Sequence, residues 1–196
     1  MKIRCTTAAV LMTFFMVGGL VTGISAPASA AGITYYVSAA GSDSNTGTSS
    51  STPWKSLSKV NSTVLRSGDT VRFRRGDTWT GGLVANQSGA AAAPITLNGY
   101  GAGNAPTITG GISGNCIRIN GNYTIVDGLR GVSCGYAGIS ITGDRNTVRN
   151  SSASNNAVGI KAGSGSDFGK YTGNVLTNNN IMNVKTQGTN CGTPQA

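Results

Sequence analysis

Short segments in which apolar and polar residues alternate recur along most of this chain. Ile139-Ser140-Ile141 is one of them, and Ile117-Arg118-Ile119 has the same pattern 22 residues earlier. A second series keeps this step, because Ile125-Val126-Asp127 precedes Thr147-Val148-Arg149 by 22 residues. Alternation with a period of two is typical of β-strands, and a fixed repeat in the low twenties indicates a repetitive architecture.

The residues between these segments are rich in Gly, Asn and Asp, which accept the left-handed backbone of tight turns. Strands this short cannot bury a face alone, but when coiled and stacked they enclose columns of Ile, Leu and Val. We therefore predict an all-β fold, a solenoid of parallel sheets, over residues 69–182, with a period of about 22 residues. A β-sandwich with irregular loops is the alternative. The residues predicted to occupy turns include Asn146, Asn150, Asn155, Asn156, Asn174, Asn178 and Asn179.

The repeat also predicts which side chains face outward. In each strand the apolar residues point inward, so the residue between them points outward. Val71-Arg72-Phe73 and Ile95-Thr96-Leu97 extend the first series upstream, and Ile160-Lys161-Ala162 extends it downstream. The first predicted outward column is Arg72, Thr96, Arg118, Ser140 and Lys161, and the second is Thr109, Asp127, Arg149 and Thr177.

The segment before the repeats, residues 31–68, has the pattern of a cap. Ile33 to Ser38 alternates as a strand, and a polar loop follows. Thr52 is placed to cap a helix, with Pro53 at its first position. Apolar residues at helical spacing then predict a short amphipathic helix that covers the first turn of the solenoid; they are Trp54, Leu57, Val60 and Val64. Trp54 and Trp79 are expected to be buried.

The first 30 residues have the features of a secretory signal peptide. Lys2 and Arg4 precede an apolar run, and Ala28-Ser29-Ala30 is a small-residue cleavage site. A membrane anchor is the alternative, but the run is short and interrupted by glycine. We expect a secreted protein that has no membrane segment after cleavage.

The amino-acid composition limits which ligands and which reactions this chain is suited to. The chain has no His, and the Lys and Arg residues outnumber the acids by 15 to 6. A basic, exported protein suits acidic polymers, although a basic surface alone does not require such a partner. Nucleic acid is not expected, because no basic cluster is interleaved with aromatic residues. Of the cysteines that follow the signal peptide, Cys116 and Cys134 are the preferred disulfide pair, which leaves Cys191 over.

Four stretches in this order resemble the pectate-lyase-like superfamily of secreted right-handed parallel β-helix proteins. They are "YYVSAAGSDSNTGTSSSTPWKSLSKVN", "GDTVRFRRGDTW", "APITLNGYG" and "GISITGDRNTVRNSSASNN". The resemblance implies enzymes that act on extracellular polysaccharides, namely lyases, hydrolases and epimerases, and it also includes non-catalytic adhesins. The fold alone does not decide between these functions.

The residues present favour the lyase branch of that superfamily. The resemblance to hydrolases and epimerases would require paired Asp residues or an essential His, and these are absent. Lyases of this kind use Lys or Arg as the base, while acids and often calcium neutralise the substrate carboxylate. We therefore assign Arg118 and Lys161 as candidate catalytic residues. Asp127 is the candidate calcium ligand, although one carboxylate is few for calcium, and an ion pair with Arg149 is the alternative.

Five residues are candidates for substrate binding, either in the outward columns or as aromatic platforms. They are Arg72, Ser140, Arg149, Tyr136 and Tyr171. The alternative is a solvated outer face with no ligand.

The sequence after Met182 is polar and aperiodic, so residues 183–196 are predicted to be a tail that does not cover the last turn. We expect either the N-terminal part of a larger β-helix or a minimal form with unusual capping. The leading function is a monomeric, secreted lyase-like protein that cleaves uronate polymers by β-elimination or binds them, with acidic polysaccharide as its partner. The alternative is a binding module without activity, or an inactive fragment of a larger enzyme.

Overall fold

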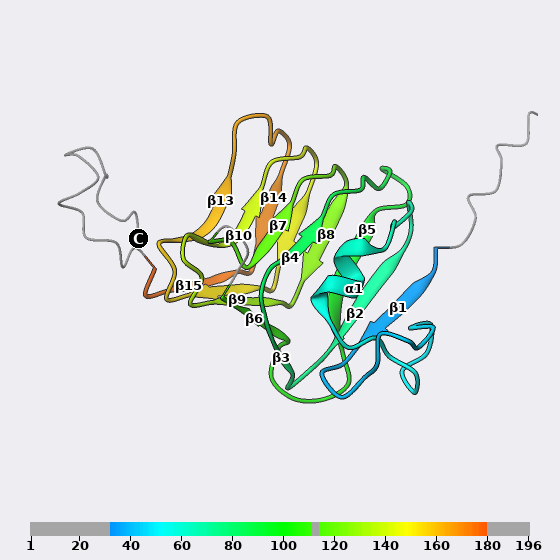
Figure 1. The fold of residues 1–196 in the computed structure, drawn as a ribbon. Coiled ribbons are helices and arrows are strands. Elements are labelled where there is room, and N and C mark those ends of the chain that lie inside the picture. The colour runs from blue at the N-terminus through cyan, green and yellow to red at the C-terminus, as the bar shows by residue number, and fades with distance from the viewer. Residues whose placement is uncertain (1–31, 111–113, 180–196) are drawn as a thin grey trace, which may run out of the picture.

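The computed structural model describes residues 32–110 and 114–179, which form fifteen strands and one short helix. The chain winds through three parallel sheets in turn and stacks each turn on the one before, as Figure 1 shows. Every strand pair is parallel. The predicted all-β solenoid is confirmed, and the β-sandwich alternative is wrong.

The six-stranded sheet, called sheet A here, begins at the N-terminal end of the described chain. Its strands in spatial order are β1 (Thr34–Val37), β2 (Thr70–Arg74), β5 (Ile95–Tyr100), β8 (Thr124–Asp127), β11 (Thr147–Arg149) and β14 (Lys170–Thr172).

The other two sheets complete each turn. Sheet B contains β3 (Thr78–Thr80), β6 (Thr107–Thr109), β9 (Arg130–Val132), β12 (Ser152–Ser154) and β15 (Val175–Thr177). Sheet C contains β4 (Leu83–Ala85), β7 (Ile117–Ile119), β10 (Ala137–Ile141) and β13 (Val158–Ala162).

The core is the interior of this coil. Each strand sends alternate side chains inward, where they stack on their counterparts in the next turn. Sheet A contributes Val71, Leu97, Val126 and Val148, all fully buried, and the register places each against the next. These columns of aliphatic side chains replace the disulfide network on which small secreted domains often rely.

Asparagine side chains hold the turns together, as the sequence predicted. Asn146 is buried; its Oδ1 accepts a hydrogen bond from the Thr124 backbone N–H, and its Nδ2 donates to the carbonyls of Gly121 and Gly143. Asn156 is also buried and repeats this arrangement at another turn. These amides satisfy backbone groups that the turn would otherwise leave buried without a partner.

The cap differs from its prediction at one point. The helix α1 spans Leu57–Ser62, and its N-cap is Ser56 rather than Thr52. The residues around Trp54 are extended instead, because Trp54 forms a parallel bridge with Val37.

The burial of the cap is otherwise close to the expectation. Trp54, Leu57 and Val60 are buried in the core, whereas Val64 is 73% exposed because the helix ends before it. Trp79 is buried as predicted. The side chain of Asn61 bonds the edge of the first strand in sheet C, so the helix covers that edge.

The predicted outward columns mix strands of different sheets and need correction. Arg72 and Thr96 lie in sheet A, whereas Arg118, Ser140 and Lys161 lie in sheet C, where Val84 is the next member. In the second column Thr109 and Thr177 belong to sheet B, and the neighbours of Asp127 and Arg149 are Asn98 and Thr172. Long loops in the early turns cause the error, since Ile95 aligns with Thr124 rather than with Ile117.

Cys116 and Cys134 form a disulfide with their Cα atoms 5.6 Å apart, which confirms the predicted pair. Cys191, the predicted signal peptide and the predicted tail lie outside the described residues. Within residues 32–110 and 114–179, no helix is long and apolar enough to cross a membrane.

Candidate functional site

The outer face of sheet A carries rows of polar and charged side chains. One row of outward residues crosses all six strands and is called the polar row: Tyr36, Arg72, Asn98, Asp127, Arg149 and Thr172. A parallel row two residues earlier contains Thr96, Ile125, Thr147 and Lys170. The strict register of parallel strands produces these rows, since equivalent positions repeat about every 4.8 Å.

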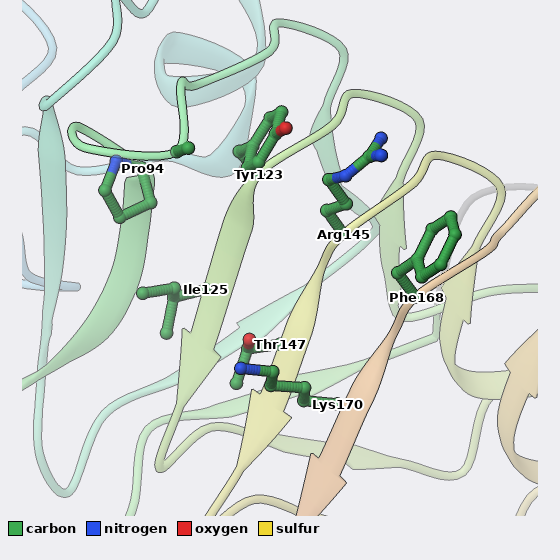
Figure 2. Close-up of a pocket in the computed structure, with 8 residues that line it drawn as sticks. Pro94, Tyr123, Ile125, Arg145, Thr147, Phe168 and Lys170 are labelled. Atoms are coloured by element: carbon green, nitrogen blue, oxygen red, sulfur yellow. The ribbon is translucent and has the colours of Figure 1, made fainter. Parts of the chain in front are cut away.

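A hollow of about 370 Å³ opens on this face where the strands begin; it is called the first hollow. Its floor is formed by outward residues of sheet A, and Figure 2 shows three side chains from successive turns along its upper rim. The lining residues are Ala91, Pro94, Tyr123, Ile125, Arg145, Thr147, Phe168 and Lys170.

The rim side chains Tyr123, Arg145 and Phe168 form a stack. The guanidinium carbon of Arg145 lies 5.7 Å from the centre of the Tyr123 ring and 4.9 Å from that of the Phe168 ring. Both distances are within the range of a cation–π interaction. The stack therefore presents two aromatic rings and a planar cation at regular intervals along the solenoid.

The backbone at these three residues is unusual. Tyr123, Arg145 and Phe168 have φ values of 51°, 54° and 55°, the left-handed region that bulky residues seldom occupy. The two other turns of each coil also have left-handed residues, but these are Gly, Asn or Ser, which are smaller. Gly128, Asn150 and Gly173 occupy one turn, and Ser133, Asn155 and Asn178 occupy the other. Within residues 32–110 and 114–179, the left-handed residues with large side chains are those at the rim of the first hollow. Strain of this kind gathers at functional sites.

The first hollow is cationic. Arg145 and Lys170 line it, and neither forms an ion pair with a described acid. Asp144 and Asp167 lie beside it in equivalent turns of successive coils, and Asp144 Oδ1 accepts a hydrogen bond from the Asp167 backbone N–H. Along this face the cations Arg72, Arg74, Arg145, Arg149 and Lys170 outnumber the nearby carboxylates, which are those of Asp77, Asp127, Asp144 and Asp167. An anionic group is therefore favoured on this surface.

Asp127 is occupied by protein partners. Its Oδ2 lies 2.8 Å from Arg149 Nε, and its Oδ1 accepts a hydrogen bond from Asn150 Nδ2 at 3.0 Å. This is the ion pair that the sequence offered as the alternative to a calcium ligand. The part of the chain that the structure describes holds no group of three or more potential metal ligands. Both carboxylate oxygens of Asp127 are therefore held by neighbouring side chains.

The remaining acids also have structural partners. Asp69 is buried and accepts backbone hydrogen bonds from Ile33 and Arg66. Asp77 accepts from Ser38 and Ala39, and Asp43 holds the backbone that leads into α1.

The candidate catalytic residues lie on a different face. Arg118, Ser140 and Lys161 are adjacent across sheet C, so the predicted order of these three is confirmed while Arg72 is removed from it. Ser140 is buried between its two cationic neighbours, and Arg118 Nε is covered without a hydrogen-bond partner. Lys161 Nζ lies 4.9 Å from the centre of the Tyr136 ring. These four residues form one polar patch, separate from sheet A.

Tyr171 does not form an outer platform. It aligns with Val148, whose side chain points into the core, so Tyr171 belongs to an inward column. It is 40% exposed in the last described turn, and burial raises the pKa of its hydroxyl. Arg72 and Arg149 do share a face, as members of the polar row rather than of two separate columns.

Sequence reasoning missed the first hollow. The signal was present, because Asn122-Tyr123, Asp144-Arg145 and Asp167-Phe168 occupy equivalent turn positions. An aromatic residue or arginine at a position that favours Gly or Asn is the anomaly that identifies the site.

No model of a known protein family matches the chain. A segment of 82 residues is 43% identical to the lacto-N-biosidase of Bifidobacterium longum subsp. longum; the match covers 39% of this chain and 5% of that protein. The chain therefore spans a small part of the curated relative that it matches.

Solved structures with the same architecture include the GH136 lacto-N-biosidase from Eubacterium ramulus, with a TM-score of 0.66 at 20% identity, covering 74% of this chain and 34% of that one. The pectate lyase Pel9A follows with a TM-score of 0.55 at 18% identity, covering 83% of this chain and 56% of that one. These likenesses establish a right-handed parallel β-helix fold, which is the fold that the sequence resemblance implied.

Proposed function

We propose that this chain is the carbohydrate-binding part of an exported β-helix protein and that it holds an acidic glycan on the outer face of sheet A. The observation that carries the proposal is the stack of Tyr123, Arg145 and Phe168 at the first hollow, kept in left-handed conformations that these residues otherwise avoid. Nothing in the packing of the core requires this stack, since Phe168 is 73% exposed.

The shape and chemistry of the first hollow suit a sugar. Ring faces and the side chains of Pro94 and Ile125 supply apolar surface, while Thr147 and Lys170 supply a few polar groups that would orient a ligand. Arg145 and Lys170 would pair with a carboxylate or a sulfate on the sugar. The names of the relatives, a lacto-N-biosidase and a pectate lyase, refer to carbohydrate substrates and support the same class of ligand. The predicted signal peptide supports action outside the cell.

Binding should be tested by isothermal titration of the purified protein with pectate, alginate, heparan sulfate and neutral arabinogalactan. We expect an acidic polymer to bind and the neutral polymer to bind weakly or not at all. Arg145→Ala should reduce affinity at least about tenfold, the loss of one charge-assisted contact. Arg130→Ala removes a cation from sheet B and serves as the matched control. Equal binding by both variants, or no binding to any polymer, would overturn the proposal.

A lyase activity is the second candidate and belongs to sheet C. Two observations favour it. Arg118, Ser140 and Lys161 are neighbours across three adjacent strands, and Arg118 Nε is buried without a hydrogen-bond partner. A Lys or Arg base would remove the C5 proton beside a uronate carboxylate that the other cation neutralises. The C4–O bond would then break, so that the glycosidic oxygen leaves with a proton and a C4–C5 double bond forms. Ultraviolet absorbance of unsaturated product, with and without calcium, tests this. A rise in absorbance that Lys161→Ala abolishes would support elimination. A constant absorbance with protein that binds the polymer would support binding without cleavage.

A further inference from the structure

A second hollow lies on the same outer face of sheet A, towards the N-terminal end of the solenoid. Its volume is about 370 Å³, and it is lined by Ser38, Ala40, Ser50, Pro53, Arg74 and Tyr100. Arg74 and Tyr100 are register partners at the carboxyl ends of β2 and β5, and both point outward. The other four residues come from the loop region that precedes α1. The second hollow is therefore formed where the N-terminal cap meets the sheet.

Tyr100 and Arg74 line the second hollow, and Tyr36 and Arg72 lie beside it in the polar row. Ser38, which also lines it, donates a hydrogen bond to the Asp77 carboxylate. Tyr100 packs edge-on against Tyr36, with ring centres 5.1 Å apart, and Arg72 lies 5.9 Å from the Tyr36 ring centre. Burial raises the pKa of the Tyr100 hydroxyl, so this group stays protonated and able to donate a hydrogen bond. Arg74 is exposed and is in no ion pair with a described acid. Two aromatic rings and two cations thus meet at this end as well.

The register gives the separation of the two hollows. Tyr100 lies on β5, two strands from β11, which is about 10 Å across the sheet. Ile125 and Thr147, which form the floor of the first hollow, align with Thr96 on β5. Tyr100 lies four residues after Thr96, a distance of about 13 Å along the strand. The two hollows are therefore about 16 Å apart along a diagonal of one flat face.

The diagonal crosses the polar row. Asn98 and Asp127 are neighbours in that row and lie between the two hollows. Arg149 pairs with Asp127 and leaves guanidinium nitrogens other than Nε outside that ion pair. A chain of sugar rings that ran along the diagonal would find both donors and acceptors beneath it, which is what hydroxyl groups need.

We propose that the two hollows are end subsites of one extended site, and that the ligand is an oligosaccharide long enough to occupy both rather than a single sugar. This inference rests on the proposed function, because it concerns the length and the direction of the glycan whose binding is proposed there. A ligand that joins two sites gains affinity when it fills the second, because the second contact is intramolecular. Short sugars would bind at one hollow only.

The test is a comparison of ligand lengths with galacturonate and alginate oligomers, each as a disaccharide and as a decasaccharide, in isothermal titrations. We expect the decasaccharide of the bound type to bind at least about tenfold more tightly than the disaccharide. Arg74→Ala and Tyr100→Ala should lower decasaccharide affinity much more than disaccharide affinity and so remove this gain. Arg74→Ala is the safer variant, since Arg74 is exposed while Tyr100 packs on Tyr36. Arg66→Ala, an exposed cation off this face, is the control.

The outcomes separate the inference from the function on which it rests. If the two lengths bind alike, or if Arg74→Ala and Tyr100→Ala leave the length gain intact, the extended site is wrong while glycan binding stands. If no oligomer and no polymer binds, the proposed function fails and the extended site fails with it. A gain that both variants remove, in protein with an unchanged urea midpoint, supports the inference.

Discussion

The guanidinium carbon of Arg145 lies 4.9 Å from the ring centre of Phe168 on the next turn of the solenoid, and both residues have a left-handed backbone. Each such residue costs about 1 kcal/mol relative to an ordinary conformation. Phe168 recovers little of that cost by burial, because its side chain is 73% exposed. Stability and ligand binding should therefore respond to substitution in opposite directions at this position.

Phe168→Asn should leave the free energy of unfolding unchanged or raise it by up to about 1 kcal/mol, since Asn accepts the left-handed region. The same change should weaken glycan binding by removing one ring of the stack. Urea denaturation and isothermal titration measure the two effects. Asn155→Phe, at an exposed left-handed position in another turn of the coil, is the converse control and should destabilise the protein. A large loss of stability in Phe168→Asn would show that the stack serves the fold.

Asn156→Ala should lower the free energy of unfolding by about 3 kcal/mol, because it leaves the Cys134 N–H and the Gly131 carbonyl buried without partners. The side chain is fully buried, so water cannot replace it. Asn120→Ala is the control; that residue is exposed and bonds Asn86. We expect the control to change stability by less than about 1 kcal/mol. Equal effects on the urea midpoint would contradict the structural role of the buried amide.

The Asp43 carboxylate should make stability depend on pH below about 4. Burial acts to raise its pKa, but hydrogen bonds from the side chain and backbone of Ser56 and from the Lys55 N–H, together with the charge of Lys59, outweigh it and lower the pKa below 3.8. A lowered pKa stabilises the native state above the ordinary value, and this contribution is lost as the pH falls through the native value.

Asp43→Asn should therefore be less stable than the unmodified protein at neutral pH, and the gap should narrow as the pH falls below about 4. Urea midpoints measured at several pH values test this. Because Ser56 Oγ both donates to Asp43 and caps α1, the loss should appear first in the cap. A gap that stays constant with pH would mean that the loss of stability does not depend on the ionisation of Asp43.

The ion pair of Asp127 and Arg149 should contribute at most about 1 kcal/mol, since Arg149 is 46% exposed and Asp127 25% exposed. A double-mutant cycle with Asp127→Ala and Arg149→Ala measures the coupling free energy. It should shrink as salt is added, because salt screens exposed charges. A coupling well above this range, or one that is insensitive to salt, would indicate that the pair is less solvated than its exposure suggests.

The parallel solenoid could be predicted because each strand obeys the same alternation and because the later turns keep a regular length. Ile117 and Ile139 pair as the 22-residue step requires. The early turns could not be assigned, since Ile95 also lies 22 residues before Ile117 yet belongs to another sheet. Apolar–polar–apolar triplets look alike in all three sheets, so the pattern alone does not say to which sheet a triplet belongs.

The candidate site was harder to predict than the fold. Arg72, Asp127 and Arg149 were identified as outward residues, but their shared row emerges only once sheet A is defined. Tyr123, Arg145 and Phe168 lie in turns, where strand periodicity gives no information. Their grouping depends on the three-dimensional register of the turns, and only the unusual residue types at those positions point to it.

The stacking of equivalent turns also bears on how such a surface changes during evolution. Duplication of one 22-residue unit would add a further strand to each sheet and one more position to the rim of the first hollow, about 4.8 Å beyond the last. A substitution at a single rim position would alter recognition at one point and leave the geometry intact. Under the proposed function, glycan length and glycan chemistry would therefore be selected independently, the first by the number of turns and the second by the residue at each turn.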